Sequence, residues 1–521
     1  VAMPRPGYNV FVMGEPGTGR FSFVKRYLKA EGKRLQTPAD WVYVNNFDEP
    51  REPRALELPG GAAAAFIADI NGLVDNLVAT FPAVFEHPTY QQRKSAIDRA
   101  FNQRYDKALD VIERLALEKD VALYRDSSNI AFTPMLDGKA LDEAEFSQLP
   151  EVDRERFHTD ISELEERLNE ETITLALQPL LAPLSEKYAE NAGVCGYLQA
   201  MQVYLLKTVV EQLVDDAKTD AQARKLLEEQ YCPSLVVGHS VNGGAPVVFE
   251  PHPTYDNLFG RIEYSTDQGA LYTTYRQLRP GALHRANGGF LILEAEKMLS
   301  EPFVWDALKR SLQSRKLKME SPLGELGRLA TVTLNPQMIP LQVKVIIIGS
   351  RQLYYALQDA DPDFQEMFRV LVDFDEDIPM VDESLEQFAQ LLKTRTSEEG
   401  MAPLTSDAVA RLATYSARLA EHQGRLSARI GDLFQLVSEA DFIRHLAGDE
   451  MTDAGHIERA LKAKATRTGR VSARILDDML AGVILIDTAG AAVGKCNGLT
   501  VLEVGDSAFG VPARISATVY P

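Results

Sequence analysis

The sequence predicts an α/β protein in which one parallel-sheet domain is interrupted by a long helical insertion and followed by smaller domains. Three observations lead to this prediction. An apolar run at residues 8–13 leads into a glycine-rich turn and then a helical pattern, which is the opening unit of a parallel α/β domain. Nearly all-apolar runs return far downstream, at residues 289–293 and 343–348. Elsewhere, apolar residues recur over long stretches with helical spacing.

Size and charge limit the classes of protein that fit. A chain of 521 residues is too long for one core, so we expect several domains. Hydrophobic residues at 45% and charged residues at 25% are ordinary for a globular protein. The balance of 55 basic against 75 acidic residues gives a net charge of −20. This charge argues against nucleic acid as a partner.

The cysteines and the apolar runs indicate the setting of the protein. Cys195, Cys232 and Cys496 lie far apart and form no C-x-x-C pair, so neither a zinc site nor a disulfide framework is predicted. A reducing, cytoplasmic location fits this pattern. The apolar stretch at residues 62–68 ends at Asp69, well short of the roughly 18 residues that a membrane span needs. We expect no signal peptide and no membrane partner.

The α/β domain is expected in two parts. Residues 1–60 hold the first strand, a helix at 21–30 and a second strand at 41–44. Strand patterns resume after a long gap, so residues 231–378 form the second part. These later strands are predicted at 234–237, 246–249, 289–293 and 343–348. The last two are nearly all apolar, as strands covered on both faces should be.

Residues 61–230 are expected to form a helical insertion. Helical spacing covers 91–117 and 152–188, and a third helix is predicted at 196–216. Turn residues and short alternating runs fill 126–138 between the two long helices. This order predicts a coiled-coil-like arm with a β-rich tip. An ordinary helical bundle is the alternative.

Residues 379–475 are expected to form a compact helical domain. Four helices are predicted between residues 382 and 466, with Ser406 capping one and Thr452 capping another.

From residue 476 the pattern changes to glycines and short strands. These strands are predicted at 482–486, 498–502 and 513–519. They begin a sheet that the chain does not finish.

The glycine-rich turn has the spacing of a phosphate-binding P-loop, G-x-x-x-x-G-K-[ST]. Glycines allow backbone N–H groups to point at phosphate oxygens, and the following helix adds its positive dipole end. The preceding strand and following helix supply the context that the motif requires. A tight turn without a ligand is the alternative. The motif consists of Gly14, Glu15, Pro16, Gly17, Thr18, Gly19, Arg20 and Phe21.

Two positions of this motif depart from the pattern. Arg20 stands where the motif has lysine, and Phe21 stands where it has a serine or threonine. A guanidinium is wider and planar, so it does not simply replace an ammonium group. Phe21 has no oxygen for magnesium. Ser22 follows one residue later, about 100° around the helix, so it should point elsewhere.

The second half of a nucleotide site would be an apolar strand followed by Asp-Glu. Here residues 290–293 are followed by Glu294 and Ala295. Glu294 could hold Mg²⁺ with a longer reach, but Ala295 cannot orient a water for attack. ATP or ADP with Mg²⁺ is therefore a doubtful cofactor, and we expect hydrolysis to be weak or lost. Binding without turnover is an alternative.

Four further segments resemble one known family. Residues 253–261 (PTYDNLFGR) and 279–289 (RPGALHRANGG) are similar to the segment before the second nucleotide motif in Lon proteases of the B and C types. Residues 493–501 (VGKCNGLTV) and 505–510 (GDSAFG) resemble the start of the Lon protease domain. The matches occur in the family's order. The resemblance implies an AAA+ module with a helical lid at 379–475 and a truncated protease start at 476–521.

The resemblance also implies roles for single residues. Ser350 matches the sensor-1 position, and Arg429 matches the sensor-2 arginine of the lid. Arg369 falls where the family has an arginine finger, although a surface salt bridge is the alternative for both arginines. Tyr272, in residues 267–272, matches the pore loop that grips substrate. A role as a core residue of an edge strand is equally open for Tyr272.

The leading hypothesis is the AAA+ module of a Lon-like serine–lysine protease that admits unfolded polypeptide to a proteolytic chamber. The resemblance implies a homo-oligomer, a hexameric ring, with unfolded or damaged polypeptides as substrates. The catalytic serine–lysine pair would lie beyond Pro521, so no catalytic residue is assigned in this chain. The alternative is a non-proteolytic AAA+ remodelling factor that binds ATP.

The histidines suggest no catalytic or metal site. Residues 238–242 (GHSVN) approach a nucleophile elbow but lack its second glycine. His239, His252 and His284 have no metal-ligand spacing, so turn or core roles are expected.

Overall fold

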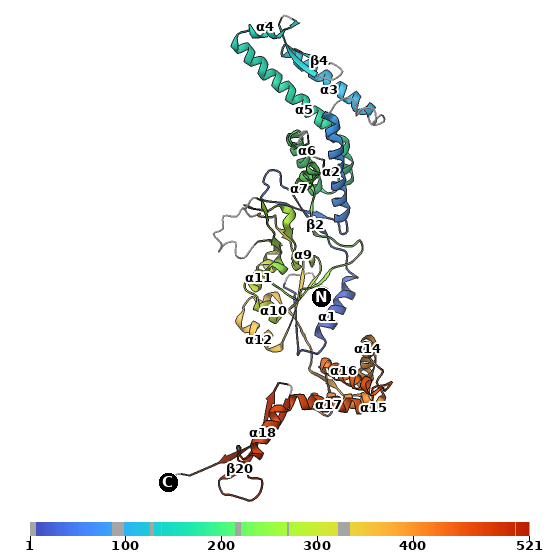
Figure 1. Ribbon diagram of the computed structural model, residues 1–521, viewed down its shortest axis with the longest axis vertical. Coiled ribbons are helices and arrows are strands. Elements are labelled where there is room, and N and C mark those ends of the chain that lie inside the picture. The colour runs from blue at the N-terminus through green and yellow to red at the C-terminus, as the bar shows by residue number, and fades with distance from the viewer. Residues whose placement is uncertain are drawn as a thin grey trace. The chain divides into compact units, whose positions relative to one another are not determined.

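The computed structural model describes residues 7–85, 98–125, 130–136, 138–213, 220–267, 270–320, 334–505 and 507–519 (Figure 1). Its internal contacts divide the chain into two compact units. The first comprises Val1–Phe11, Lys25–Ile348 and Leu357–Val370. The second comprises Val12–Val24, Gly349–Ala356 and Leu371–Pro521.

A five-stranded sheet forms the centre of the α/β fold. Its strand order is β17 (Val370–Asp373), β1 (Val10–Met13), β16 (Lys344–Gly349), β13 (Phe290–Glu294) and β8 (Val247–Phe249). β13 runs parallel to both of its neighbours, β16 and β8. Four of the five residues of β13 are buried, because a parallel strand is covered on both faces. All of these strands except β17 were predicted from apolar runs.

Short elements complete this part of the chain. The helices are α1 (Arg20–Gly32), α8 (Tyr255–Phe259), α9 (Ala282–Arg285), α10 (Ala295–Ser300), α11 (Val304–Ser314), α12 (Arg351–Ala360) and α13 (Phe364–Met367). Small antiparallel pairs are β9 (Arg261–Ile262) with β12 (Leu278–Arg279), β10 (Ser265–Asp267) with β11 (Ala270–Tyr272), and β14 (Lys316–Leu317) with β15 (Ile339–Pro340).

A second sheet is antiparallel and contains two of the strands predicted from the sequence. Its order is β3 (Arg54–Leu58), β2 (Asp40–Val44) and β7 (Ser234–Val237). The sequence predicted β2 and β7 as strands of the α/β domain without assigning either to a sheet. β2 is buried along its whole length, with Val42 and Trp41 in two different apolar cores. A strand that is covered on both faces has the same apolar sequence pattern in a parallel and in an antiparallel sheet. The pattern of β2 therefore could not show to which kind of sheet it belongs.

The chain between β3 and β7 is mainly helical. Its helices are α2 (Ala63–Phe85), α3 (Asp98–Glu118), α4 (Glu143–Ser147), α5 (Glu151–Lys187), α6 (Ala192–Leu213) and α7 (Asp220–Tyr231). Between α3 and α4 lie β4 (Val121–Arg125), β5 (Ile130–Leu136) and β6 (Lys139–Ala140). The expected long helices match α3, α5 and α6. Parts of the predicted helix (91–97) and of the predicted tip (126–129 and 137) lie outside the described residues.

Helix α5 is 37 residues long and contributes to two separate cores. Near its start, Phe157 and Leu164 pack in a core with residues of α3 and β4. Further along, Ile173 and Leu177 pack in another core with residues of α2 and α6. One helix therefore connects the β-strand region to the base of the insertion.

A buried carboxylate joins the two ends of the helical insertion. Asp40, at the start of β2, is 1% exposed. Its Oδ2 accepts a hydrogen bond from the N–H of Ala63 (2.9 Å), which begins α2. Its Oδ1 accepts from the N–H of His239 (2.9 Å) and lies 2.9 Å from His239 Nδ1, just after β7. Asp40 therefore holds together the segments where the chain leaves and re-enters this region.

Four further helices pack around one core in the second unit. They are α14 (Asp382–Glu398), α15 (Ser406–Leu419), α16 (Ile430–Ala447) and α17 (Ala454–Thr468), with a small pair of strands, β18 (Asp377–Pro379) and β19 (Arg425–Ser427). The core residues come from all four helices. The prediction of four helices in this region was confirmed.

Both predicted helix caps in this group were one residue off. The cap of α15 is Thr405, whose Oγ1 accepts from the N–H of Ala408 (3.4 Å). The cap of α17 is Asp453, whose Oδ1 accepts from the N–H of His456 (2.9 Å). Adjacent polar residues offered two candidates for each cap, so the sequence pattern alone could not identify the one used.

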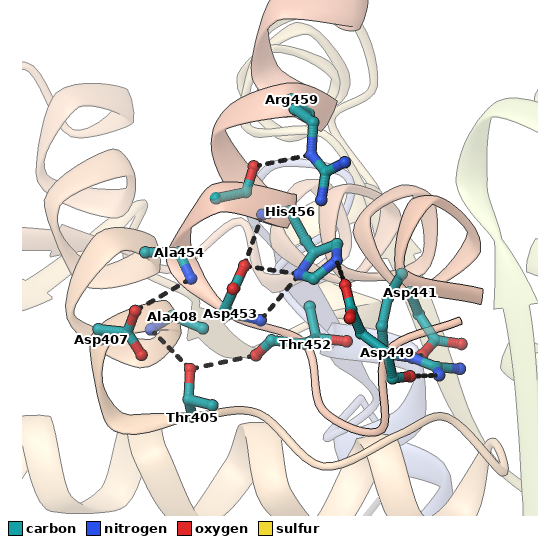
Figure 2. A network of polar contacts seen from close by, with 12 residues as sticks. Thr405, Asp407, Ala408, Asp441, Asp449, Thr452, Asp453, Ala454, His456 and Arg459 are labelled. Atoms are coloured by element: carbon teal, nitrogen blue, oxygen red, sulfur yellow. Dashed lines mark hydrogen bonds and ion pairs between the residues drawn. The ribbon is translucent and has the colours of Figure 1, made fainter. Parts of the chain in front are cut away.

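Figure 2 shows how these two caps are linked. Thr405 donates its hydroxyl hydrogen to the carbonyl oxygen of Thr452 (3.2 Å). The His456 ring is 1% exposed and lies between two carboxylates, with Nε2 3.0 Å from Asp449 and Nδ1 2.6 Å from Asp453. The hydrogen bond from the His456 N–H holds the pKa of Asp453 below its usual value.

The last described segment is a helix followed by a long hairpin. Helix α18 (Arg470–Leu480) precedes β20 (Lys495–Val504), which pairs antiparallel with β21 (Ser507–Ser516). The strand predicted at residues 482–486 was wrong. The N–H groups of Val483 and Ile484 both donate to the carbonyl of Asp478, so they close the end of α18 and cannot join a ladder. Among the described residues, no helix is long and apolar enough to cross a membrane.

Replacing Thr405 by alanine should weaken the start of α15, because the helix loses its N-cap and its bond to Thr452. The expected cost is about 1 kcal/mol, equivalent to roughly fivefold faster amide exchange in the first turn. Hydrogen exchange read by mass spectrometry measures this change. Ser406→Ala is the matched control, since Ser406 is exposed and caps nothing. An equal effect of both substitutions would contradict the assignment of the cap.

His284 makes the first unit sensitive to acid. Its side chain is buried in α9, and its Nδ1 accepts from the N–H of Gly281 (3.2 Å). Burial lowers the pKa of His284 from 6.5 to about 3. As pH falls below 6.5, the unfolded chain takes up a proton that the folded chain refuses. Stability is therefore lost progressively as pH falls from 6.5 towards 3.

Between pH 7 and pH 5, proton uptake by His284 in the unfolded chain should lower the free energy of unfolding by about 2 kcal/mol. In His284→Asn, which keeps an acceptor for Gly281, that part of the pH dependence should disappear. Urea unfolding followed by tryptophan fluorescence reports it, because Trp41 and Trp305 both belong to the first unit. The quantity compared between the unaltered chain and His284→Asn is the decrease in the free energy of unfolding from pH 7 to pH 5. An unchanged drop would show that His284 binds its proton equally well in the folded and the unfolded chain.

Candidate nucleotide site

The glycine-rich turn connects β1 to α1, as the P-loop spacing predicts. β1 is fully buried, and α1 begins at Arg20. Gly17 and Gly19 have φ angles of 86° and 77°, a region that residues with a Cβ rarely adopt. Thr18 closes the turn, with its hydroxyl donating to the carbonyl oxygen of Glu15 (2.8 Å). The loop therefore needs glycine at these positions for its backbone shape.

The side chain of Arg20 folds back onto the loop. Its Nη1 donates to the carbonyl oxygen of Gly14 and to that of Gly349 (2.5 Å), at the end of β16. A Cβ on Gly14 would lie 3.2 Å from Arg20 Cδ and 2.8 Å from Phe374 Cβ, so glycine is required there for space. The guanidinium thus bonds to the protein's own carbonyl groups at the position where the motif lysine would contact phosphate.

The next two residues offer little for a metal ion. Phe21 is half-buried and has no oxygen ligand in its side chain. Ser22 is exposed on the first turn of α1. Phe23 is 50% exposed, and its ring packs edge-on against Phe374 with centroids 5.7 Å apart. The first turn of α1 is therefore aromatic where the motif needs a hydroxyl group.

Ser350 follows directly after β16. Its Oγ accepts from the N–H of Leu353 (3.3 Å), so it caps α12. The neighbouring Arg351 forms an ion pair with Asp373 of β17 (2.8 Å). Ser350 thus lies beside Gly349, whose carbonyl accepts from Arg20. The structure brings the predicted sensor-1 residue and the loop arginine together.

The start of α16 also contacts the loop. The N–H of Gly431 donates to the carbonyl oxygen of Gly17 (3.0 Å). Arg429 is next to this contact, but its guanidinium is paired with Asp432 of the same helix (2.8 Å) and is about half exposed. The alternative of a surface salt bridge is therefore what this structure contains for Arg429. The loop and the start of α16 are therefore joined by a backbone hydrogen bond.

The remaining predicted residues belong to the first unit. Glu294 ends β13, where its carboxylate pairs with Lys297 (2.7 Å). Ala295 is completely buried at the start of α10. No carboxylate therefore stands at the position that orients the attacking water in hydrolysing relatives of this motif.

Arg369 and Tyr272 are both on the surface of this unit. The Arg369 guanidinium lies 5.7 Å from the centre of the Tyr8 ring and is exposed. It forms a cation–π contact where a salt bridge was the alternative. Tyr272 lies at the end of β11 and is 48% exposed, next to Leu271 at 51%. Tyr272 is therefore not a core residue, and residues 268–269 of the expected loop lie outside the described part of the chain.

Sequence reasoning missed a buried acidic residue at the same edge of the sheet. Glu250 follows β8, is 8% exposed, and pairs with Arg285 (3.2 Å). Its other oxygen accepts from the N–H of His252 (3.1 Å). A carboxylate directly after an apolar strand was the available signal, since the ends of parallel strands gather at one edge. Within the described residues, no three His, Cys, Asp or Glu side chains lie close enough together to bind a metal ion.

The arrangement fits a phosphate only in its backbone. The loop has the glycine conformations and the helix start that a phosphate site requires. Its side chains do not fit hydrolysis, because Arg20 bonds to two carbonyls, Phe21 has no oxygen ligand, and Ala295 has no carboxylate. The loop backbone is therefore suited to bind a phosphate group, whereas the side chains needed to hydrolyse a nucleotide are missing.

Comparisons with known protein families match three parts of the chain. Residues 243–375 match the LonB-like AAA domain, and residues 403–467 match the LID domain of the archaeal LonB AAA+ ATPase. Residues 40–73 match the helical domain of the Lon-like LonC.

Two curated proteins are similar to the chain over about half its length. A putative Lon protease homolog of Escherichia coli (strain K12) is 26% identical over 246 residues, covering 47% of this chain and 41% of the relative. A putative Lon protease homolog of Haemophilus influenzae is 27% identical over 269 residues, covering 49% and 42%. The chain is a Lon-related protein. It matches about two-fifths of the length of these Lon homologs.

Among solved structures, the Brucella abortus NtrX is 16% identical to this Lon-related chain, covering 41% of it and 43% of NtrX. Its TM-score of 0.27 is too low to support a comparison of folds. The AAA-type assignment rests on the family matches, and the parallel sheet and many helices are consistent with it.

Replacing Arg20 by alanine should loosen the loop. Two carbonyl groups lose their donor, at a cost of about 1–3 kcal/mol. We expect roughly tenfold faster amide exchange over residues 14–24, measured by mass spectrometry. Ser22→Ala is the matched control on the same turn, because Ser22 is exposed. Unchanged exchange in Arg20→Ala would mean that the guanidinium does not hold the loop.

Proposed function

We propose that this chain is the AAA+-like module of a Lon-like serine–lysine protease, which admits unfolded polypeptide to a proteolytic chamber without appreciable ATP hydrolysis. The family matches support the Lon-related part of this proposal. In this proposal, α2–α7 form the inserted arm and α14–α17 form the lid. The protease pair lies outside this chain.

The observation that carries the loss of hydrolysis is the bonding of Arg20. A nucleotide would need this cation for its phosphates, but the guanidinium donates to the carbonyls of Gly14 and Gly349. Its displacement would leave those carbonyls without their donor, which costs free energy. Ala295 adds to this, because it is completely buried and has no carboxylate to orient an attacking water.

The contact between Gly17 and Gly431 gives the module a structural role. One backbone hydrogen bond of 3.0 Å joins the loop directly to the start of α16. We propose that the lid stays on the loop with or without nucleotide, so that the module is a scaffold and gate.

Exposed apolar side chains support assembly with further protein. Leu480 of α18 is 78% exposed, and Leu499 of β20 is 76% exposed. Large exposed apolar side chains on neighbouring elements are typical of surfaces that another protein part covers. We propose a homo-oligomeric, hexameric ring in which these elements contact protease segments. Tyr272 and Leu271 would contact polypeptide at its pore, and Arg369 would face the neighbouring subunit.

Calorimetric titration with Mg-ATP and Mg-ADP, followed by phosphate release, tests the proposal. The chain should give no saturable heat up to about 1 mM nucleotide and no phosphate above background. The double variant Arg20→Lys with Phe21→Thr restores both motif side chains and should gain nucleotide binding of at least tenfold, about 1.4 kcal/mol. Hydrolysis still requires a carboxylate at position 295, so the double variant should bind without turnover.

Ser22→Ala serves as the control that leaves both motif positions unchanged. Steady phosphate release by the unaltered chain would falsify the proposed loss of hydrolysis. It would then identify an ATP-driven module in which Arg20 replaces the lysine.

A further inference from the structure

β3 is an edge strand, because the sheet order is β3, β2, β7. In an antiparallel pair, alternate residues direct their backbone groups towards the neighbour and away from it. The N–H of Ala55 and the carbonyl of Glu57 bond to side chains outside the sheet. Ala55 and Glu57 are therefore the outward-facing residues, and Leu56 between them bonds to β2.

Two side-chain amides occupy the ends of this outer edge. Gln337 Oε1 accepts from the N–H of Ala55 (3.0 Å). Asn191 Nδ2 donates to the carbonyl oxygen of Glu57 (2.8 Å). A primary amide has the same donor and acceptor as a peptide group. The edge thus already binds two peptide-like groups at the positions that a neighbouring strand would use.

The groups between the two amides have no partner among the described residues. No described donor reaches the carbonyl oxygen of Ala55, and no described acceptor reaches the N–H of Glu57. In a parallel pair, one residue donates to the carbonyl before its opposite residue and accepts from the N–H after it. The free pair around Leu56 is therefore the pattern that one residue of an added parallel strand would complete.

A pocket of about 980 Å³ lies along this edge. The β3 residues, the turn between α5 and α6, and the segment before β15 line it. Its apolar walls include Trp41, Tyr188 and Met338, and Met338 is 45% exposed. Pockets that hold ligands measure roughly 300–1,000 Å³, so the space beside β3 is large enough for several extended residues.

The charges of the pocket indicate what would occupy it. Lys187 is neutralised by Asp69 (2.5 Å). Glu57 and Glu190 also line the pocket, and neither forms an ion pair with a described residue. An apolar segment with basic residues at its ends therefore complements the pocket in both surface and charge.

We infer that the outer edge of β3 binds an extended polypeptide segment as an added parallel strand, with one residue bonded between Ala55 and Glu57. Main-chain hydrogen bonds give such a site affinity for any extended chain, and the pocket gives it a preference for apolar side chains. This inference rests on the proposed function, in which the protein handles unfolded polypeptide. It adds a site at which such a polypeptide would bind. The site itself lies in the sheet of β2, β3 and β7.

The test uses a labelled peptide and two variants at one position. The probe is the fluorescein-labelled peptide KVTVTVK-amide, and the readout is fluorescence anisotropy of the full chain without nucleotide. Glu57→Pro removes the free N–H, and proline is tolerated where an edge strand directs its N–H away from the sheet. Glu57→Ala is the matched control that keeps the N–H and removes the carboxylate.

We expect saturable binding to the unaltered chain below about 1 mM, and binding within about threefold of that by Glu57→Ala. Glu57→Pro should bind at least tenfold more weakly, because it cannot donate the backbone hydrogen bond. The same peptide methylated on its five central backbone nitrogens should also lose at least tenfold on the unaltered chain. The methylated peptide is tested on the unaltered chain, so this comparison tests the inference even if Glu57→Pro folds poorly.

Equal binding by the proline and alanine variants, with Glu57→Pro folded by circular dichroism, overturns the inference. Equal binding of the methylated peptide, or no saturation with the unaltered chain, does the same. None of these results bears on nucleotide binding, so a failure here is distinguishable from a failure of the proposed loss of hydrolysis.

Discussion

The buried carboxylate of Asp40 is the contact on which the arrangement of the first unit depends. It satisfies the N–H that begins α2 and the backbone and ring of His239 after β7. A polar group removed from water is tolerated only when hydrogen bonds replace its hydration. Both carboxylate oxygens of Asp40 accept hydrogen bonds, so the start of α2 and the end of β7 are held at one point. The edge strand β3 pairs with β2 in the same sheet, so its position depends on the same contact.

Much of the central fold could be predicted from the sequence, since buried parallel strands are short apolar runs with little ambiguity. The strands β13 and β16 are of this kind. β3 was missed because Arg54 and Glu57 interrupt its apolar residues, as expected for an edge strand with one exposed face. The error at residues 482–486 has another cause. Apolar residues after α18 resemble a strand, but their N–H groups are used by the end of the helix.

The candidate site shows a similar limit. Glycine spacing identified the loop, because the backbone conformation depends on residues that are neighbours in the chain. The bonding of Arg20 could not be predicted in this way, since Gly349 lies 329 positions away in sequence. The hydrogen bond between Gly17 and Gly431 could not be predicted either, because it joins two backbone groups and no side-chain pattern indicates it. Substitutions in the motif indicated that the chemistry is altered, and only the structure shows which contacts replace it.

Helix α5 has a consequence for how this protein can vary in length. Its early residues, such as Phe157, belong to one core, and its later residues, such as Leu177, belong to another. One inserted residue between them would rotate one buried face by about 100° and shift it by about 1.5 Å relative to the other. Insertions of about seven or eleven residues nearly restore the rotation. The distance between the two cores can therefore change only in steps of about 10 Å or more, so relatives with arms of different reach should differ by such blocks.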